Sequence, residues 1–210
     1  MAIKSQGAIV KAESARAATK AITAVSLALP AVVTAVAHGY STGDMVYLTG
    51  IGGVTQLNNR SFAIVVLSAD TFSLAGEDTT GSTAYTSGGT AAKLTMTSIG
   101  SVSDASGFDG KATEIDVTTL LSAAKEFQVG LQDFGNLNLT LITDNSDAGQ
   151  ALLRTIKTAA STKAFSLTLS DGKISVFMAS VMSFPVDVKR DNVVMSSCAL
   201  RITNAPQWFA

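Results

Sequence analysis

Hydrophobic and polar positions alternate along much of the second half of the chain. Residues 136–142 ("NLNLTLI") have a leucine at every second position, with Asn or Thr between them. Residues 113–120 ("TEIDVTTL") and 164–169 ("AFSLTL") follow the same period of two. Such a period predicts β-strands with one apolar face turned to a core. The inward side chains would be Ile115, Val117, Leu137, Leu139, Leu141, Phe165, Leu167 and Leu169.

Residues 174–184 ("ISVFMASVMSF") differ because they are apolar on both faces. One face carries Ile174, Val176, Met178 and Met182, and the other carries Phe177, Ala179 and Val181. This pattern predicts a strand buried on both sides, with a helix on one side and a neighbouring subunit or second sheet on the other. The Asp-Gly pair in "SDGK" predicts a hairpin turn before this strand. Residues 192–203 supply the last strand.

One segment has a helical period instead of a strand period. It follows "TDNSD" (143–147), and its apolar stripe consists of Ala148, Leu152, Ile156 and Ala159, widened by Leu153. The good N-cap residues are Asp144, Asn145 and Ser146, with Asp147 suited to the first turn. Together the patterns predict a mainly β protein with one α-helix.

The first half of the chain contains shorter apolar runs separated by Gly- and Ser-rich turns. The runs "AVVTAVA", "MVYLTG", "RSFAIVVL" and "TFSL" predict short strands, the last two joined as a hairpin at Ser68–Asp70. The segment 75–94 suits loops around one short terminal strand. These elements predict a small barrel-like module within residues 20–93.

Residues 21–39 ("AITAVSLALPAVVTAVAHG") resemble an export signal or a membrane anchor at first sight. A spanning helix needs about 20 predominantly apolar residues, and this run is shorter, contains Thr and Ser, and is broken by Pro30. A signal peptide has a compact basic start, whereas Glu13 interrupts a long leader here. We therefore expect buried strands around a turn at Pro30 and no membrane-spanning segment.

Composition narrows the function classes. Of the 210 residues, 47% are apolar and 15% are charged, with 15 basic and 16 acidic residues scattered along the chain. So few charges indicate surface buried against other copies, although a small-residue β protein has a similar composition. The absence of a basic patch argues against tight nucleic-acid binding. Cys198 stands alone, so no internal disulfide is expected.

The sequence offers little catalytic chemistry. His38 is the one histidine, and no G-x-S-x-G motif accompanies it, so a structural hydrogen bond explains it better than a triad. One His and one Cys do not make a metal site, and Asp144 and Asp147 are explained by helix capping. The glycine-rich "GIGG" lacks the Lys-Ser/Thr of a phosphate-binding loop. We expect no enzyme activity and no cofactor.

Two residue pairs leave their interpretation open. Glu114 and Asp116 lie on one face of a predicted strand, which is either a solvated face or the lining of a channel. Trp208 and Phe209 lie near the end of the chain, where they either dock on another subunit or pack on the chain's own sheet.

Residues 112–153 carry a specific resemblance. The runs "EIDVTTL" (114–120) and "AKEF…GL.DFG" (124–135), followed by Asp147-Ala148-Gly149, closely resemble the tail tube proteins of long, flexible-tailed bacteriophages. The resemblance extends from residue 94 to about residue 203, with the first strand supplied by residues 5–13.

A second resemblance covers residues 20–93. This segment looks like a small β-module of phage tail proteins that is related to a β-domain of ubiquitin-activating enzymes, without any ATP or cysteine site of those enzymes. The shared positions are His38-Gly39, Gly43-Asp44, Val46, Leu57-Asn58, Phe62, Phe72, Leu74 and Tyr85 to Gly89. The resemblances imply a discontinuous tail tube core, residues 1–19 and 94–210, with a β-sandwich or barrel fold. Residues 20–93 would be an inserted domain on the outer tube surface.

The resemblance to tail tube proteins also implies function and partners. Such proteins form hexameric rings that stack into a tube, which holds the tape-measure protein, meets tail tip and terminator proteins, and passes DNA through its lumen without specific binding. The chain would be made and assembled in the host bacterial cytoplasm and reside in the virion. The lumen-facing candidates are Glu114 and Asp116.

The linker from Thr118 to Gly135 is long for a plain hairpin loop. We expect it to reach a neighbouring subunit or ring and to become ordered on stacking. The candidates for contacts between subunits are Thr118, Thr119, Lys125, Glu126, Phe127, Leu131, Asp133, Phe134, Trp208 and Phe209.

Three alternative functions remain open from the sequence. A secretion-system tube would share the fold and the self-assembly. A secreted β-rich adhesin or glycan-binding module would require residues 21–37 to act as an export signal. A hydrolase built on His38 is the weakest of the three.

Overall fold

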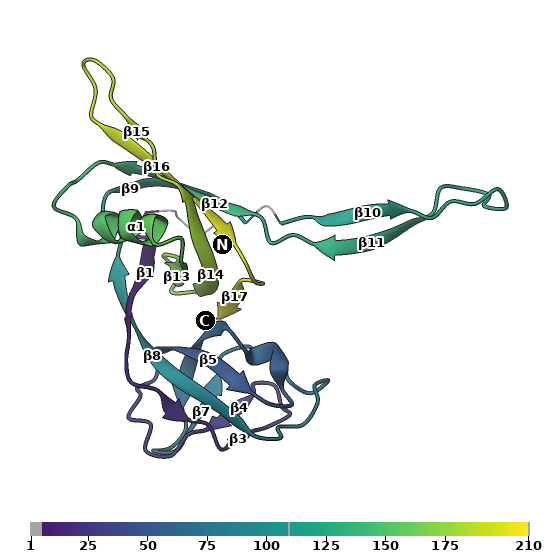
Figure 1. Cartoon of the computed structure of the whole chain (residues 1–210). Helices are drawn as coiled ribbons and strands as arrows, with labels where there is room; N and C mark the ends of the chain where they lie inside the picture. Colours follow the sequence, from purple (N-terminus) through teal and green to yellow (C-terminus); the bar gives the residue numbers. More distant parts are fainter. Residues whose placement is uncertain (1–5, 109, 210) are drawn as a thin grey trace.

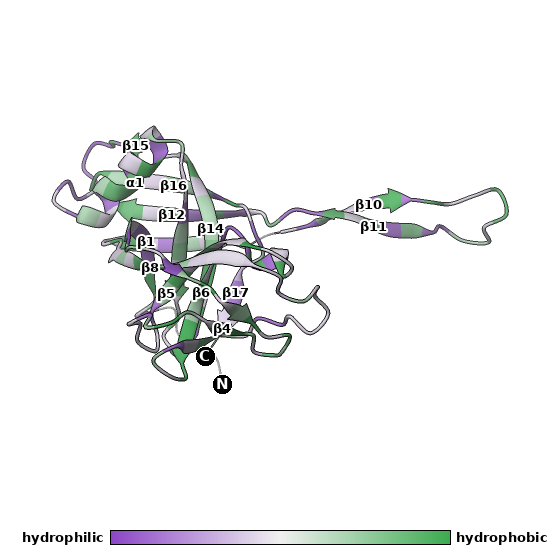
Figure 2. Cartoon of the chain, turned by 60° about the horizontal axis from the view of Figure 1, so that its bottom comes forward, coloured by the Kyte–Doolittle hydropathy of each residue, from purple (hydrophilic) through white to green (hydrophobic). Residues whose placement is uncertain are grey.

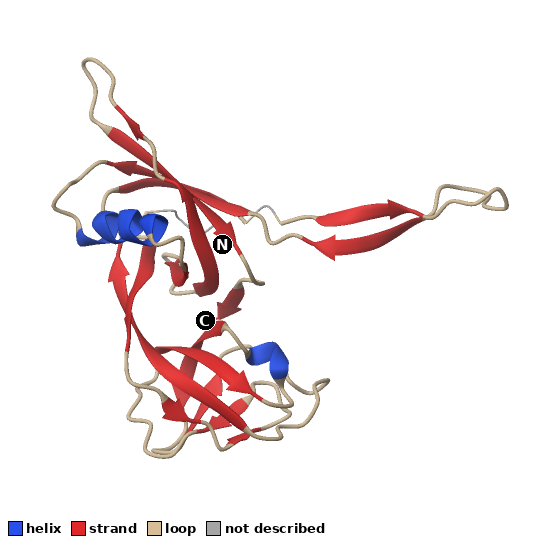
Figure 3. Cartoon of the chain, in the orientation of Figure 1, coloured by secondary structure: helices blue, strands red, loops and turns tan. Residues whose placement is uncertain are grey.

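The computed structural model describes residues 6–108 and 110–209. Figure 1 shows three parts: a curved sheet that carries the helix, a smaller β-module below it, and a two-stranded hairpin that projects sideways. Strands dominate all three parts (Figure 3). The expected mainly β fold with one α-helix is confirmed for the described part of the chain.

The curved sheet is built from both ends of the chain. Its strands are β1 (Ile9–Arg16), β9 (Val102–Gly107), β12 (Asn136–Ile142), β13 (Thr162–Thr168), β14 (Ile174–Ser183), β15 (Val186–Asp187), β16 (Met195–Ile202) and β17 (Gln207–Phe209). The order β1-β13-β14-β16-β12-β9 is antiparallel throughout. β17 pairs with β14, and β15 pairs with β16.

The smaller module comes from the segment between β1 and β9. Its elements are β2 (Lys20–Ala21), β3 (Ala24–Val25), β4 (Val32–Thr34), β5 (Met45–Ile51), the 3₁₀ turn η1 (Thr55–Leu57), β6 (Arg60–Val66), β7 (Thr71–Leu74) and β8 (Gly88–Ser98). β6 and β7 form the expected hairpin.

Strand β8 connects the two parts. Its first half pairs with β5 and β2 of the module, and its second half pairs with β1 of the curved sheet. The expectation of a short terminal strand here was wrong, because β8 continues for 11 residues across position 93. All of these strands therefore form one continuous sheet in the order β3-β4-β7-β6-β5-β8-β1-β13-β14-β16-β12-β9.

The main core lies between the curved sheet and α1 (Ala148–Thr158). The leucines of β12 and the alternate residues Phe165 and Leu167 of β13 point into it, as their period of two predicted. From α1, Leu153 and Ile156 complete the cluster. Cys198 is buried here, across from Leu139 on the neighbouring strand.

The helix begins at Ala148, later than any of the N-cap candidates Asp144, Asn145 and Ser146 predicted. Asp147 is the N-cap, and its Oδ1 accepts a hydrogen bond of 2.7 Å from the backbone N–H of Gln150. Its Oδ2 accepts another from Gly100, which fixes the helix to the end of β8. The buried face is therefore rotated from the predicted stripe: Gly149, Leu153 and Ile156 face the sheet, whereas Ala148 and Ala159 are exposed.

A Cβ atom at Gly149 would collide with the carbonyl oxygen of Ser98. A residue without a side chain is needed there, because the first turn of the helix lies directly on the backbone at the end of β8. Because glycine has no apolar side chain, the stripe predicted from the sequence did not include position 149, although its backbone packs against β8.

Strand β14 is buried on both faces, as its sequence predicted. Phe177, Ala179 and Val181 face the main core, and Val176 and Met178 face a second cluster. That second cluster also contains Met45 and Leu94, so the chain's own β5 and β8 cover the face for which a neighbouring subunit was one option. Met182, near the end of the strand, stays exposed.

Two polar groups reinforce the contact between the parts. The carboxylate of Glu13 has no exposed side-chain area, and it accepts hydrogen bonds from Arg16 Nε at 2.6 Å and from the N–H of Ala164 at 2.9 Å. The Arg16 guanidinium in turn lies 3.7 Å from the ring centroid of Tyr47 on β5. A buried carboxylate is tolerated only when it is paired and hydrogen-bonded in this way.

The second polar group lies around Glu77, in the loop that precedes β8. Arg60 Nη1 of β6 contacts its carboxylate at 2.8 Å, and the Gln207 amide of β17 donates to the same carboxylate. The C-terminal strand is thereby held against both β14 and the small module.

Residues 21–39 are strand and turn, as expected. β3 and β4 pair on either side of the turn that contains Pro30, with Val25 and Val33 buried. None of the helices in the described residues is long and apolar enough to span a membrane. The expected division into residues 1–19 with 94–210 and residues 20–93 stays a prediction. Residues 1–5, 109 and 210 of that predicted core lie outside the described residues.

The rotated helix face can be tested with adjacent leucines. We expect Leu153→Ala to lower the free energy of unfolding by about 2–5 kcal/mol, because its side chain is fully buried. Leu152→Ala should cost clearly less, because Leu152 only lines the edge of the same core. Chemical denaturation measures both values, and equal losses would contradict the orientation described here.

Candidate functional site

His38 has a structural role. Its ring is nearly buried; Nε2 lies 3.1 Å from the Ser68 carbonyl oxygen, and Nδ1 accepts a hydrogen bond of 2.9 Å from the N–H of Tyr40. The ring also stacks on Tyr40 and meets the edge of Phe72. Both ring nitrogens are thus engaged with backbone groups of turns, as the simpler interpretation of the sequence predicted.

The carboxylates near the helix also have structural roles. Asp144 accepts hydrogen bonds from the N–H and hydroxyl of Ser146, which lower the pKa of its carboxyl, and Asp147 caps the helix. Within residues 6–108 and 110–209, no group of three or more His, Cys, Asp or Glu side chains could hold a metal ion.

The most distinctive surface feature is the projecting hairpin, called here the arm (residues 111–133). It consists of β10 (Ala112–Asp116) and β11 (Phe127–Gln132), which form a separate two-stranded sheet. The segment 118–135, expected as a linker, contains the tip of this hairpin and the strand β11; that it reaches a neighbouring subunit or ring and becomes ordered on stacking stays a prediction. Residues 127–132 ("FQVGLQ") do alternate, with Phe127, Val129 and Leu131 at every second position, so the signal for β11 was present in the sequence and was overlooked.

The register of the arm places the lumen-facing candidates beside stacking candidates. Asp116 is paired with Phe127 and Glu114 with Val129, so all four side chains share one face. Hydrogen bonds from the hydroxyl and N–H of Thr118 lower the pKa of the Asp116 carboxyl, so this carboxylate is ionised at neutral pH.

The tip of the arm is a defined turn. The N–H of Ser122 donates to the carbonyl of Thr119 at 3.1 Å, and the Ser122 hydroxyl accepts from the Thr119 N–H at 3.1 Å. Leu120 and Leu121 occupy the two central positions of this turn, with 106% and 97% of their surface exposed. Gly, Pro, Asn, Asp and Ser are the usual residues of turns, so two fully exposed leucines are exceptional.

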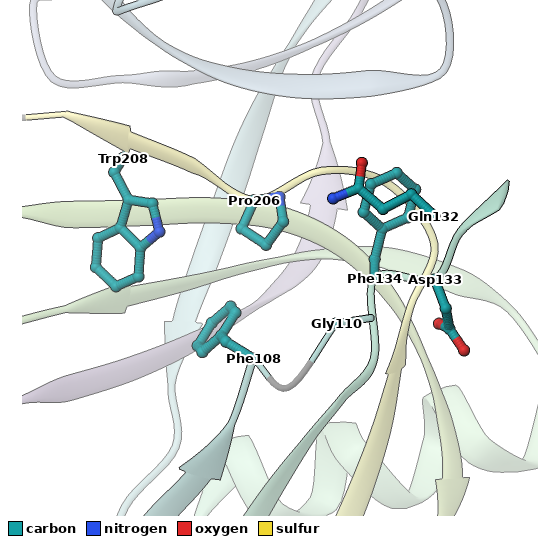
Figure 4. Close-up of a pocket in the computed structure, with 7 residues that line it drawn as sticks. All are labelled: Phe108, Gly110, Gln132, Asp133, Phe134, Pro206 and Trp208. Carbon is teal, nitrogen blue, oxygen red and sulfur yellow. The ribbon is translucent and has the colours of Figure 1, made fainter. Parts of the chain in front are cut away.

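The base of the arm is anchored to the curved sheet. Asp133 Oδ2 contacts Arg201 Nη2 at 2.7 Å, and Asp133 Oδ1 accepts from the N–H of Gly135. Those two interactions, the backbone hydrogen bond first, lower the pKa of the Asp133 carboxyl. A pocket of about 220 Å³ lies beside this anchor, lined by Phe108, Gly110, Gln132, Asp133, Phe134, Pro206 and Trp208 (Figure 4).

Trp208 and Phe209 differ in their surroundings. Phe209 packs on the cluster between β14 and the small module. Trp208 points to the other side, where its ring lies 5.8 Å from that of Phe108 and 48% of its surface is exposed. Both residues therefore pack at least partly on their own chain, and Trp208 also borders the pocket.

The predicted contact residues are brought together only in part. Thr118, Thr119, Lys125, Glu126, Phe127 and Leu131 lie along the arm, and Asp133, Phe134 and Trp208 surround its base. Sequence reasoning missed the exposed Leu121 and Val129 and the pocket residue Phe108. Leu121 stands beside the recognised run 114–120, and a leucine pair within polar turn residues was the available signal.

Comparison with known proteins agrees with this geometry. The model of the family "Phage tail tube, TTP, lambda-like" matches residues 77–176, and the model of the ubiquitin-activating enzyme E1 FCCH domain matches residues 29–94. No curated protein sequence matches the chain.

Two solved structures are similar to part of the chain. One comes from the virion of a native gene transfer agent (GTA) particle, with 16% identity, 55% of this chain and 89% of that chain covered, and a TM-score of 0.47. The other comes from the tail of an empty GTA particle with C6 symmetry, with 15% identity, 55% and 87% covered, and a TM-score of 0.47.

The chain is therefore a structural protein of a bacteriophage tail, located in the virion. Residues 77–176, just under half of the chain, match the lambda-like phage tail tube family, and residues 29–94 match the FCCH domain of ubiquitin-activating enzymes. The resemblances noted from the sequence are confirmed.

Cys198 gives a pH-dependent prediction. Burial raises the pKa of its thiol to about 12, so the reactive thiolate is almost absent from the folded protein between pH 7 and 9. We expect no reaction with a disulfide reagent in that range until the chain is unfolded, when the pKa returns to about 8.5. A Thr158→Cys variant, exposed on α1, should react at once. Rapid labelling of native Cys198 would contradict its burial.

Proposed function

We propose that the chain assembles into hexameric rings that stack into the phage tail tube. The observation that supports this most is the arm: a hairpin that contacts no other element closely, yet exposes Ile115, Phe127, Val129 and Leu131 in addition to its two tip leucines. Figure 2 shows hydrophobic residues, in green, on β10 of the arm, which projects away from the body. A two-stranded hairpin is marginally stable alone in water, so a partner surface is expected.

The open edge of β9 is a second point of contact between subunits. Among the described strands β9 pairs only with β12, so its other edge has unpaired backbone groups. When the edges of neighbouring subunits pair around a closed ring, no unpaired edge is left. Contacts between subunits whose rotation does not close a ring extend the assembly into a filament.

We further propose that residues 1–19 and 94–210 form the tube core and that residues 20–93 form a domain on the outer wall. The separate apolar cluster of the small module, whose members lie between Ile22 and Ala91, supports this division. Its joint with the core through β8 holds it on one side of the curved sheet, where it can project without blocking a central channel.

The resemblance also implies the remaining partners: the tape-measure protein inside the tube, tip and terminator proteins at its ends, and DNA in transit. A chain of nearly balanced charge suits a conduit that must not retain DNA. Catalysis is not part of this proposal, since His38 and the helix carboxylates are occupied structurally. Assembly would take place in the host cytoplasm.

The assembly proposal is tested by shortening the arm. In the variant, a short Gly-Ser turn replaces residues 114–130. We expect the purified wild-type chain to form rings or tubes in negative-stain electron microscopy as its concentration rises. The variant should keep the fold and lose the tubes. Unfolding curves that match the wild type serve as the folding control. Tubes formed equally well by the variant would contradict the role of the arm, and a wild-type chain that stays monomeric throughout would contradict the proposed function.

The proposed role of Glu114 and Asp116 is to line the lumen and repel DNA phosphates. We expect Glu114→Gln/Asp116→Asn phages to assemble tails but deliver DNA more slowly, measured as infectivity per particle and as the rate of DNA ejection. The matched control, Asp171→Asn/Asp191→Asn, neutralises two exposed acids outside the arm. Unchanged DNA passage in the first variant would remove these residues from the lumen.

A further inference from the structure

The tip of the arm is apolar, and aromatic side chains border the pocket at the base of the arm. At the tip, the turn 119–122 holds Leu120 and Leu121 outward through hydrogen bonds that involve Thr119 and Ser122. These side chains make the tip an apolar projection. No other segment of the described chain covers them, since both are essentially fully exposed.

The pocket offers an aromatic recess. Figure 4 shows Phe108 and Trp208 on one side, Phe134 and Gln132 on the other, and Pro206 between them. Its position is fixed, because Phe108 packs edge-to-face on buried Phe177 at 5.2 Å and Trp208 belongs to β17, which is paired with β14. The pocket measures about 220 Å³ and is open to solvent, and Gln132 and Asp133 line it beside the aromatic rings, so it has room for one leucine side chain.

Charges near the two features are also complementary. Lys125 and Glu126 follow the leucine turn, and neither takes part in an ion pair among the described residues. Asp133 lines the pocket, is half-exposed and is paired with Arg201, and its N–H donates to the carbonyl oxygen of the exposed Lys111. A tip that enters the pocket can therefore bring Lys125 close to the Asp133 carboxylate.

The tip cannot reach the pocket of its own chain. The two lie at opposite ends of the arm (Figure 1), which at about 3.3 Å per strand residue separates them by on the order of 30 Å. The occupant must come from another copy. A contact between two different surfaces of identical chains is heterologous, and it repeats along an open filament unless the rotation closes a ring.

We propose that the Leu120–Leu121 turn of one copy inserts into the pocket formed by Phe108, Phe134, Pro206 and Trp208 of a second copy. This inference rests on the proposed function, because it specifies the surface that the arm meets during assembly. Insertion buries one of the two leucines beside the half-exposed Trp208 and sets the distance between successive copies by the length of the arm.

Disulfide trapping tests the contact directly. Leu121→Cys and Gln132→Cys are introduced together, so that a disulfide forms only when a tip lies within bonding distance of a pocket rim. After mild oxidation of assembled protein we expect a ladder of linked chains and, by mass spectrometry, a peptide that joins positions 121 and 132. Leu121→Cys with Thr158→Cys is the matched control and should give no ladder. Native Cys198 is buried and stays unlinked.

A second pair of variants measures the energetic role of the leucines. We expect Leu120→Ser/Leu121→Ser to raise the concentration needed for assembly by more than about tenfold. Leu29→Ser/Leu67→Ser, two exposed leucines of the small module, should assemble as the wild type does. If tubes form but the 121–132 link is absent and the serine variant assembles normally, tip insertion is wrong while the proposed function stands. If the wild type itself never assembles, both are overturned.

Discussion

The fold depends on the joint between the curved sheet and the small module. Strand β8 takes part in both, and behind it Met45, Leu94, Val176 and Met178 form a shared apolar cluster. Around this cluster, the buried Glu13 with Arg16 and Tyr47, and Glu77 with Arg60 and Gln207, provide directional contacts. Burial of apolar surface supplies most of the stability of such a joint, and the polar contacts fix its geometry. A flexible tether between the parts would leave β14 with one face exposed.

The joint has a consequence for function. A subunit that carries an extra domain in a tube must hold that domain in a constant position, because every copy repeats the same contacts. Continuous strand pairing through β8 gives one body in which the open edge of β9 and the small module have fixed relative directions. The arm is the exception to this integration, since it is paired only with itself. The stability of the arm therefore depends on a neighbour more than the stability of any other part of the molecule does.

The strands of the arm and its tip expose different kinds of side chains. The strands expose acidic and apolar side chains on the same face, with Glu114 opposite Val129 and Asp116 opposite Phe127. The tip exposes only the two leucines. One face of the arm cannot pack against a neighbouring subunit and repel DNA in the same contact. Substitutions in the strands and substitutions at the tip therefore separate the roles of these two parts of the arm.

The sequence by itself determined the strands of the core and their faces. Leu137, Leu139 and Leu141 had to point inward, and residues 174–184 had to be buried on both sides, because a strand's side chains alternate and apolar ones avoid water. It also carried the resemblance to tail tube proteins, through the run 114–135. Only the tertiary structure decided what covers the second face of β14 and that Gly149 rather than Ala148 meets the sheet. It also brought Phe108, Phe134 and Trp208 to one pocket. These outcomes depend on backbone approach and on contacts between distant segments, which the local period of a sequence does not contain.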